Sequence, residues 1–232
     1  MKNLVIIPTY NEKENILLLI SEIFHQVPET EILVVDDGSP DGTGVLVKDF
    51  MMTNSKIHIL ENPGKGGLGK AYLQGFGWAL EQGFESCVQM DADFSHRPQD
   101  LKKIVQALQS HPVVIGSRYI KGGGTANWSW YRKVISCFGS LYARLILGYP
   151  LHDWTGGFNG WRASVLRSLD LSSVRSEGYS FQIEMKYRAL QKSFTPIEVP
   201  ILFEERREGA SKMSLAIVIE AFYRVWQIRF RV

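Results

Sequence analysis

Short runs of apolar, β-branched residues alternate with longer amphipathic stretches over the first half of the chain. The runs cover residues 3–7, 31–36, 56–60, 86–90 and 113–115, and we expect a strand at each. Helices are predicted between them, at residues 13–25, 42–52 and 70–81 and after Pro98. This βαβ rhythm predicts an α/β fold, Rossmann-like, in which helices cover both faces of a mostly parallel sheet.

Composition narrows the class of protein further. The 232 residues are 45% hydrophobic and 22% charged, which is typical of a globular chain with one substantial core. A net charge of +2 is too small to indicate a nucleic-acid partner. The two cysteines, Cys87 and Cys137, have no metal-binding or redox motif around them, so we expect reduced core residues of a cytosolic protein.

Polar segments follow three of the predicted strands. They comprise residues 8–12, 36–39 and 91–93, each directly after an apolar run. In parallel α/β sheets the ligand site lies beyond the carboxyl ends of the strands. The three segments are therefore predicted to converge on one rim.

The segment Asp91-Ala92-Asp93 is the sharpest of these features. Two carboxylates two residues apart at a strand end can reach one hard cation, and Mg²⁺ or Mn²⁺ held this way suits a diphosphate group. A bare triplet of this kind is more often a surface turn, but its position after a buried strand favours the metal site. For Asp36 and Asp37 a simple turn and a hydrogen-bonding role toward a base or ribose remain equally open.

A phosphate-binding P-loop is the rival interpretation of the glycine-rich segment 64–70. Its spacing matches the first part of that motif, but Ala71 stands where Ser or Thr would hold Mg²⁺. The segment also follows the third predicted strand, whereas a P-loop normally follows the first strand of its unit. A nucleotide hydrolase is therefore a weaker hypothesis than a metal-dependent transferase.

Taken together, these segments resemble the family 2 glycosyltransferases, and within them the dolichyl-phosphate (polyprenol-phosphate) mannosyltransferases. The resemblance extends over nearly the whole chain, through residues 7–12, 34–43, 67–71, 90–96, 116–119, 132–133, 153–158, 178–185 and 206–212. It implies a GT-A-type fold and a single domain over residues 1–232. Within it we expect a nucleotide-sugar-binding half (1–121), an acceptor half (122–212) and a membrane-surface helix (213–232).

The resemblance also implies a role for each matching residue. The nucleoside-sugar donor would contact Pro8, Tyr10, Glu12, Val35, Asp37, Asp91, Ala92, Asp93, Arg118, Arg206 and Lys212. The metal ligands would be Asp91 and Asp93, with Ser95 where some relatives have a Gln ligand. Arg118 and Arg132 would bind the acceptor phosphate, and the catalytic set would be Asp91, Asp93, Arg118 and Arg132.

Physical chemistry agrees with the role of the two arginines, because a guanidinium fork binds phosphate oxygens bidentately. An isolated arginine is more often a solvated surface residue. Arg132 is distinguished by its neighbours Trp128, Trp130 and Tyr131, whose side chains favour a membrane–water boundary.

The reaction implied by the resemblance is an inverting transfer of mannose from GDP-mannose to the phosphate of a polyprenyl lipid. A phosphate monoester is largely ionised at neutral pH, since its second pKa is about 6, so no general base is needed. Glucose transfer from a UDP-sugar is the alternative within the family. A sugar-nucleotide binding module without catalysis is the alternative outside it.

The C-terminal segment, residues 214–232, is predicted to form an amphipathic helix. Leu215, Ile219, Phe222 and Trp226 lie close to one stripe, and Arg224, Arg229 and Arg231 are placed to meet anionic headgroups. A helix docked on the sheet is an equally weighted interpretation. Because the acceptor is a lipid, we expect peripheral binding at the cytoplasmic face of a membrane, alone or with a membrane anchor subunit.

Overall fold

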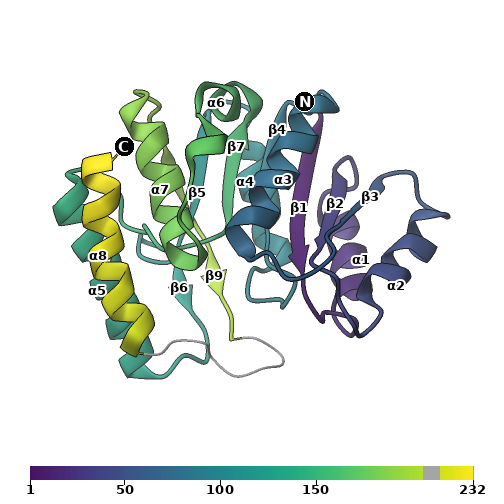
Figure 1. Ribbon diagram of the computed structural model, residues 1–232, viewed down its shortest axis with the longest axis horizontal. Helices are drawn as coiled ribbons and strands as arrows, with labels where there is room; N and C mark the ends of the chain where they lie inside the picture. The colour runs from purple at the N-terminus through teal and green to yellow at the C-terminus, as the bar shows by residue number, and fades with distance from the viewer. Residues whose placement is uncertain (206–214, 232) are drawn as a thin grey trace.

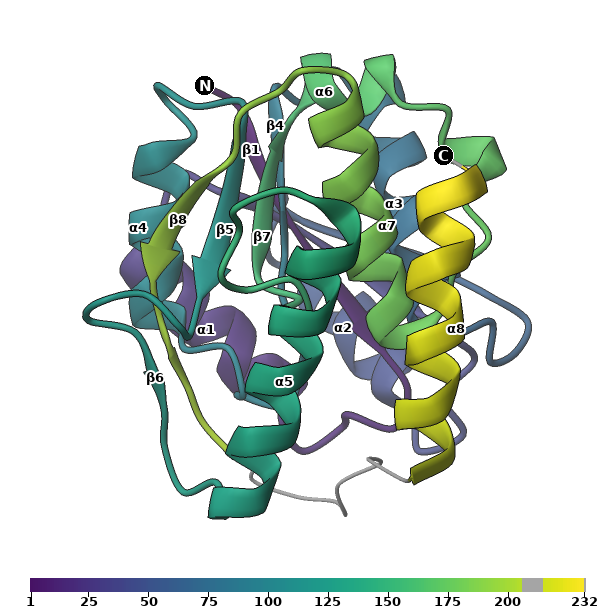
Figure 2. The ribbon, with the colours of Figure 1, turned by 90° about the vertical axis from the view of Figure 1, so that its left-hand side faces the viewer.

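The computed structural model describes residues 1–205 and 215–231, and for residues 215–221 only the backbone. Its main sheet has seven strands in the order β3-β2-β1-β4-β7-β5-β8 (Figures 1 and 2). The strands are β1 (Asn3–Thr9), β2 (Glu31–Asp36), β3 (Ile57–Glu61), β4 (Ser86–Gln89), β5 (Val113–Ser117), β7 (Asn159–Arg162) and β8 (Ile197–Pro200). A separate short ladder pairs β6 (Gly124–Thr125) with β9 (Leu202–Phe203).

The helices are α1 (Ile16–Gln26), α2 (Thr43–Met51), α3 (Leu68–Glu81), α4 (Pro98–Ala107), α5 (Trp130–Leu147), α6 (Ala163–Ser168), α7 (Gly178–Gln191) and α8 (Leu215–Arg231), with a short 3₁₀ turn, η1 (Leu171–Ser173). All five predicted strands are present, and so are the predicted helices. Helix α1 begins at Ile16, three residues later than predicted. Its first turn is replaced by a tight turn in which the backbone N–H groups of Asn15 and Ile16 both donate to the Glu12 carbonyl.

The sheet is mostly parallel, as predicted. Strand β1 pairs in parallel with β2 and β4, and β5 pairs in parallel with β8. Strand β7 is the exception, because it lies between β4 and β5 and runs antiparallel to both. Strands from both predicted halves of the chain therefore share one sheet, and the division into a donor half and an acceptor half stays a prediction about function.

Two apolar clusters hold the helices to the two faces of the sheet. Alternate residues of β1 enter opposite clusters: Leu4 and Ile6 face α3 and α7, whereas Val5 and Ile7 face α1 and α4. Figures 1 and 2 show these helices on the two sides of the sheet. This arrangement confirms the predicted α/β fold with both faces covered.

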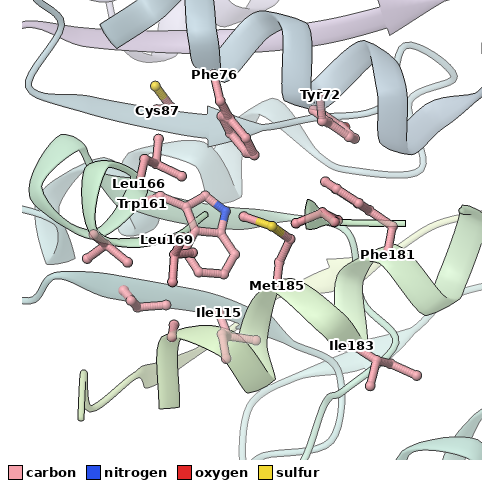
Figure 3. Close-up of a cluster of buried hydrophobic side chains, with 14 of the residues drawn as sticks. Tyr72, Phe76, Cys87, Ile115, Trp161, Leu166, Leu169, Phe181, Ile183 and Met185 are labelled. Atoms are coloured by element: carbon pink, nitrogen blue, oxygen red, sulfur yellow. The ribbon is translucent and has the colours of Figure 1, made fainter. Parts of the chain in front are cut away.

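The cluster on the α3 side surrounds Trp161 of β7 (Figure 3). The Trp161 indole N–H donates to the Gln89 side-chain oxygen (2.8 Å), so its one polar atom is satisfied within the core. Cys87 belongs to this cluster, as predicted, but Cys137 is exposed on α5. The prediction of a buried Cys137 was wrong because position 137 falls on the outward face of an amphipathic helix.

Helices α5 and α8 lie side by side at one end of the molecule (Figure 2). Val225 and Ile228 of α8 are buried, and the Phe222 ring packs on Tyr142 of α5 with a centroid distance of 4.1 Å. Helix α8 also packs against α7. The C-terminal helix is thus docked, but on other helices and not on the sheet.

Candidate active site

The polar segments after β1 and β2 are joined by side-chain hydrogen bonds at the rim of the sheet. The Thr9 hydroxyl donates to Asp36 Oδ1 (2.7 Å), and the Asp37 N–H donates to the Thr9 carbonyl (3.0 Å). The Glu12 N–H donates to the Thr43 hydroxyl oxygen (3.0 Å) at the start of α2. The predicted convergence of these two segments therefore holds.

The Asp37 carboxylate organises the glycine-rich segment that follows β3. Its Oδ2 accepts hydrogen bonds from the N–H groups of Gly66 (2.9 Å) and Gly67 (3.1 Å), and its Oδ1 accepts one from the Asn62 amide (2.8 Å). Because those N–H groups already donate to a carboxylate, they do not form the phosphate cradle of a P-loop. Any contact of Asp37 with a donor nucleotide stays a prediction.

The other predicted nucleoside contacts differ in accessibility. Tyr10 is exposed, and the Lys65 ammonium lies 4.4 Å from its ring centroid. Pro8 and Glu12 are half-buried at the same rim. The Val35 side chain is fully buried in the core, so a ligand at this edge could reach only its backbone. Arg206 and Lys212 lie outside the described residues.

The segment after β4 holds its two carboxylates in a strained turn. Phe94 has a φ of 61°, a left-handed conformation that is rare for a large side chain and that concentrates at functional sites. Asp93 Oδ1 accepts the Ser95 N–H (3.0 Å), and Asp91 Oδ1 accepts the Tyr72 hydroxyl (3.1 Å). The Asp91 side chain is 26% exposed, whereas Asp93 as a residue is only 7% exposed.

These residues fit a divalent cation that takes its remaining ligands from substrate and water. The Ser95 hydroxyl oxygen is buried and has no hydrogen-bond partner in the described part of the chain, so a polar atom is left over beside the two carboxylates. Residues 1–205 and 215–231 contain no cluster of three or more His, Cys, Asp or Glu side chains that could form an all-protein metal cage. Two carboxylates and open positions are typical of Mg²⁺ sites that bind phosphates.

His96 connects the acidic turn to the rest of the site. Its Nδ1 accepts the Asp91 N–H (3.0 Å), which places the ring proton on Nε2. Burial lowers the pKa of His96, against the opposing effect of the Asp91 and Asp93 charges, so the imidazole is neutral at pH 7. Arg118 lowers the same pKa. The acids and Arg118 therefore all act on one buried ring.

Arg118 forms a bidentate ion pair with Asp153. Its Nε and Nη2 donate to the two Asp153 oxygens at 2.7 Å each, and its backbone N–H donates to Oδ2 at 3.0 Å. Burial raises the pKa of Asp153, but the charge and hydrogen bonds of Arg118 together with the charge of Lys186 outweigh burial and bring the pKa to about 2. Nη2 also donates to the Thr155 hydroxyl (2.8 Å), whereas Nη1 makes no hydrogen bond to any described residue. Nη1 is therefore the atom of Arg118 that is available to a ligand.

Lys186 stabilises the loop that carries Asp153. This fully buried side chain donates to the backbone carbonyls of Asp153 (2.9 Å), Trp154 (3.1 Å) and Gly156 (2.9 Å). Burial lowers the pKa of Lys186 to about 8, although Asp153 acts in the opposite direction. Sequence reasoning did not assign it a role; a lysine among the apolar residues of α7 was the available signal.

Trp128 lies close to both predicted acceptor arginines. The Arg132 guanidinium carbon is 4.1 Å from its ring centroid, and that of Arg118 is 5.7 Å away. Trp128 is only 8% exposed, so its predicted place at a membrane–water boundary was wrong: it packs against Phe203 at the β6–β9 ladder. Trp130 and Tyr131, at 77% and 59% exposed, do face outward.

Strand β9 and the residues after it hold the acidic turn and the arginine pair together. The Glu204 N–H donates to the Ser95 carbonyl, and the Ala126 N–H donates to the Phe203 carbonyl. The Phe203 ring lies 5.4 Å from the His96 ring centroid and 5.4 Å from the Arg118 guanidinium carbon. The site thus combines a carboxylate pair with two arginines across one aromatic side chain.

Comparison with known proteins agrees with this combination of fold and site. The model for glycosyl transferase family 2 matches residues 4–170, and the chain belongs to this family of glycosyltransferases. Two relatives are each 46% identical to it. One is the polyprenol monophosphomannose synthase of Mycolicibacterium smegmatis, over 99% of this chain and 88% of that protein. The other is the undecaprenyl-phosphate mannosyltransferase of Micrococcus luteus, over 97% of this chain and 93% of that protein.

Solved structures confirm the GT-A-type fold. The glucosyl-3-phosphoglycerate synthase of Mycobacterium tuberculosis, in complex with Mn²⁺, uridine diphosphate and phosphoglyceric acid, matches with a TM-score of 0.68 and 17% identity, over 99% of this chain and 78% of that one. A further mycobacterial protein matches with a TM-score of 0.70 and 17% identity, over 99% of this chain and 74% of that one. The resemblance inferred from the sequence motifs is confirmed by the relatives, and the fold by these structures.

Proposed function

We propose that this glycosyltransferase moves mannose from GDP-mannose to the phosphate of a polyprenyl lipid, with inversion at the anomeric carbon. The observation that carries the proposal is the pair Arg118 and Arg132, both near the Trp128 ring, with Phe203 and His96 connecting Arg118 to the Asp91–Asp93 turn. The Asp91–Asp93 turn suits the diphosphate of the donor, and the arginine pair suits the phosphate of the acceptor. The names of the two relatives support mannose as the sugar and a polyprenyl phosphate as the acceptor.

On the donor side, Asp91 and Asp93 would hold a divalent cation, Mg²⁺ or Mn²⁺, which neutralises the diphosphate leaving group when bound. Ser95 would reach it directly or through water, since its hydroxyl oxygen has no other described partner. The Asp37 segment and Tyr10 would hold the nucleoside at the neighbouring part of the rim. Arg206 and Lys212, which lie outside the described residues, would also contact the donor, as the resemblance implies.

On the acceptor side, the two arginines would orient an already ionised phosphate for attack on the sugar. Asp153 fixes the direction of Arg118 and leaves Nη1 free of hydrogen bonds to described residues. A neutral His96 is no general base toward a substrate through Nδ1, because that atom accepts the Asp91 N–H. Catalysis would then depend on orientation and on stabilising the departing diphosphate.

An exposed apolar surface beside this site supports binding to a membrane. We call it the α5/α8 face, and it consists of Trp130, Tyr131, Val134, Ile135, Phe138, Leu141 and Leu145 of α5 with Tyr223, Trp226 and Phe230 of α8. Contiguous exposed apolar surface marks interaction sites, and Trp and Tyr favour the lipid headgroup region. Figure 2 shows the two helices next to each other on one side of the molecule.

Basic side chains flank the α5/α8 face, among them Lys133, Arg144, Arg224 and Arg231. They suit anionic headgroups, so we propose peripheral binding at the cytoplasmic face of a membrane with α5 as well as α8 in contact with lipid. No helix in residues 1–205 and 215–231 combines the length and apolar character needed to cross a bilayer. A membrane anchor subunit is the alternative partner for the same face. Binding to vesicles of pure lipid, without any other protein, would identify lipid as the partner.

One transfer assay tests the central proposal. Radiolabelled GDP-mannose and UDP-glucose would be supplied separately with polyprenyl phosphate and Mg²⁺ or Mn²⁺, and the lipid product would be extracted and counted. We expect label in lipid only from GDP-mannose, and none with unphosphorylated polyprenol. Label from UDP-glucose alone would replace mannose by glucose, and release of nucleotide without lipid product would overturn the transferase.

A further inference from the structure

Trp128 and Arg132 are in contact, and each carries one buried N–H donor without a hydrogen-bond partner among the described residues. The Trp128 Nε1 and the Arg132 Nε are both inaccessible to solvent and make no hydrogen bond to any described residue. The guanidinium lies 4.1 Å from the indole ring centroid, so the two donors belong to side chains in direct contact. Leaving one buried donor unsatisfied costs about 1–3 kcal/mol, and two such donors on side chains in contact indicate a missing acceptor.

The surroundings of Trp128 explain which kind of acceptor would fit. Both arginines face its ring, and the nearest described carboxylates already have partners: Asp153 holds Arg118, and Glu205 holds Arg132 through Nη1 at 3.2 Å. Phe203 packs edge-on against the indole, with ring centroids 5.2 Å apart. The backbone before Trp128 is also constrained, because Asn127 has a φ of 61°. The indole is therefore held firmly beside two guanidinium groups, each of which is paired with one carboxylate.

We propose that Trp128 is a phosphate-binding residue: its ring holds the two arginines on one platform, and its indole N–H donates to an oxygen of the acceptor phosphate monoester. The proposal rests on the proposed function, because it assigns Trp128 to the same acceptor site. It also gives an acceptor to the otherwise unsatisfied N–H groups. Trp128 thereby acts on the phosphate itself, and the exposed Trp130 and Tyr131 are left to contact lipid.

A matched pair of variants tests the role of the N–H group. Trp128→Phe keeps an aromatic ring beside the arginines and removes the indole donor. The control, Trp78→Phe, makes the same change in α3, where Trp78 packs on His58 and Phe84. We expect Trp128→Phe to raise the KM for polyprenyl phosphate on the order of 10- to 100-fold, as for the loss of a hydrogen bond to a charged group. The KM for the sugar nucleotide should stay within about twofold, and Trp78→Phe should match wild type in both.

A measurement on the wild-type protein avoids any dependence on how the variant folds. The six tryptophans give up to six indole N–H signals in a ¹H–¹⁵N spectrum, and single Trp→Phe variants assign them. Titration with farnesyl phosphate should move the Trp128 signal and leave the Trp78 signal in place. Inorganic phosphate should move it only at much higher concentration, and farnesol not at all, which separates a lipid phosphate from free phosphate and from the lipid chain.

The outcomes separate this inference from the proposed function. If wild type transfers sugar to polyprenyl phosphate but Trp128→Phe keeps its acceptor KM and the Trp128 signal does not move, Trp128 has no role in phosphate binding and the transferase stands. If wild type makes no lipid product but its Trp128 signal moves with farnesyl phosphate, the phosphate site stands and the proposed reaction does not.

Discussion

At the scale of single residues, Asp91 and Asp93 have different surroundings although only Ala92 separates them. Asp91 is partly exposed beside Tyr72, whereas Asp93 is nearly buried and accepts the Ser95 N–H. An Asn at position 93 keeps an oxygen for that N–H but loses the charge that would hold a cation. One substitution should therefore remove the proposed metal site while it leaves the fold intact.

Asp93→Asn should lower the transfer rate by roughly 100-fold or more, because a metal ion contributes several kcal/mol of charge stabilisation in such reactions. Its melting temperature should stay close to that of wild type. Initial rates at saturating Mg²⁺ and thermal unfolding measure the two effects, with Asp49→Asn on the exposed side of α2 as the control. Near wild-type transfer by Asp93→Asn would exclude a metal-binding role for this carboxylate.

Arg132→Ala should raise the KM for polyprenyl phosphate by about 10- to 100-fold, the range expected for a charge-assisted hydrogen bond to phosphate. The donor KM should not change, since the proposal assigns Arg132 to the acceptor phosphate. Steady-state kinetics with each substrate varied in turn provides the measurement. Arg167→Ala, an exposed arginine on α6, serves as the control, and an equal effect of both variants would remove Arg132 from the acceptor site.

At the scale of elements, α5 has two chemically distinct sides. Ser140, Ala143 and Leu147 are buried against the body of the protein, whereas the residues of the α5/α8 face are exposed. The sequence predicted membrane contact for the C-terminal helix and a membrane–water boundary for the aromatic residues around Arg132, but it did not join the two segments. The docking of α8 on α5 extends that interpretation, because it brings exposed apolar residues of two segments that are far apart in the sequence onto adjacent helices.

Trp130→Ser combined with Leu145→Ser should weaken vesicle binding by roughly 30-fold or more, since each of the two side chains contributes about 1–3 kcal/mol when it enters lipid. The fold should be preserved because both side chains are largely exposed, at 77% and 71%. Flotation with vesicles that contain anionic lipid measures binding. Val45→Ser with Met52→Ser, exposed residues near α2, is the matched control, and equal flotation of both double variants would exclude α5 from membrane contact.

At the scale of the whole molecule, one buried lysine links the second half of the chain to the acceptor site. Lys186 of α7 experiences the charges of Asp153, Arg118 and Glu198, and its three hydrogen bonds go to the loop that grips Arg118. Burial lowers its pKa to about 8 from an ordinary value of 10.5. Between these two pH values the unfolded chain binds the proton more strongly than the folded protein does.

The free energy of unfolding of wild type should therefore rise relative to Lys186→Met as the pH increases from about 8 to about 10.5. Below pH 8 the difference between the two proteins should be constant, because Lys186 is protonated in both the folded and the unfolded state. Denaturant unfolding at several pH values between 7 and 10.5 measures the difference. A difference that is independent of pH would mean that the Lys186 ammonium is not desolvated in the folded protein.

The amino-acid sequence by itself determined the positions of the first five strands along the chain, the helices between them and the convergence of their polar ends. These features follow from local periodicity and from the rule that parallel strands share a carboxyl edge, so they need no knowledge of distant contacts. The motif resemblance added the family and a list of site residues. Of the residues that are described, Asp91, Asp93, Arg118 and Arg132 do gather around His96 and Trp128.

Only the tertiary structure decided how that site is built. The ion pair of Asp153 with Arg118 joins residues 35 positions apart in the sequence, and the hydrogen bonds of Lys186 join residues 30 to 33 positions apart. Strand β7 inserts antiparallel between two strands that precede it in the chain. The burial of Trp128 and the exposure of Cys137 likewise depend on which side of a loop or helix faces the body of the protein. No local pattern encodes these choices, because each depends on the packing of segments brought together by the completed fold.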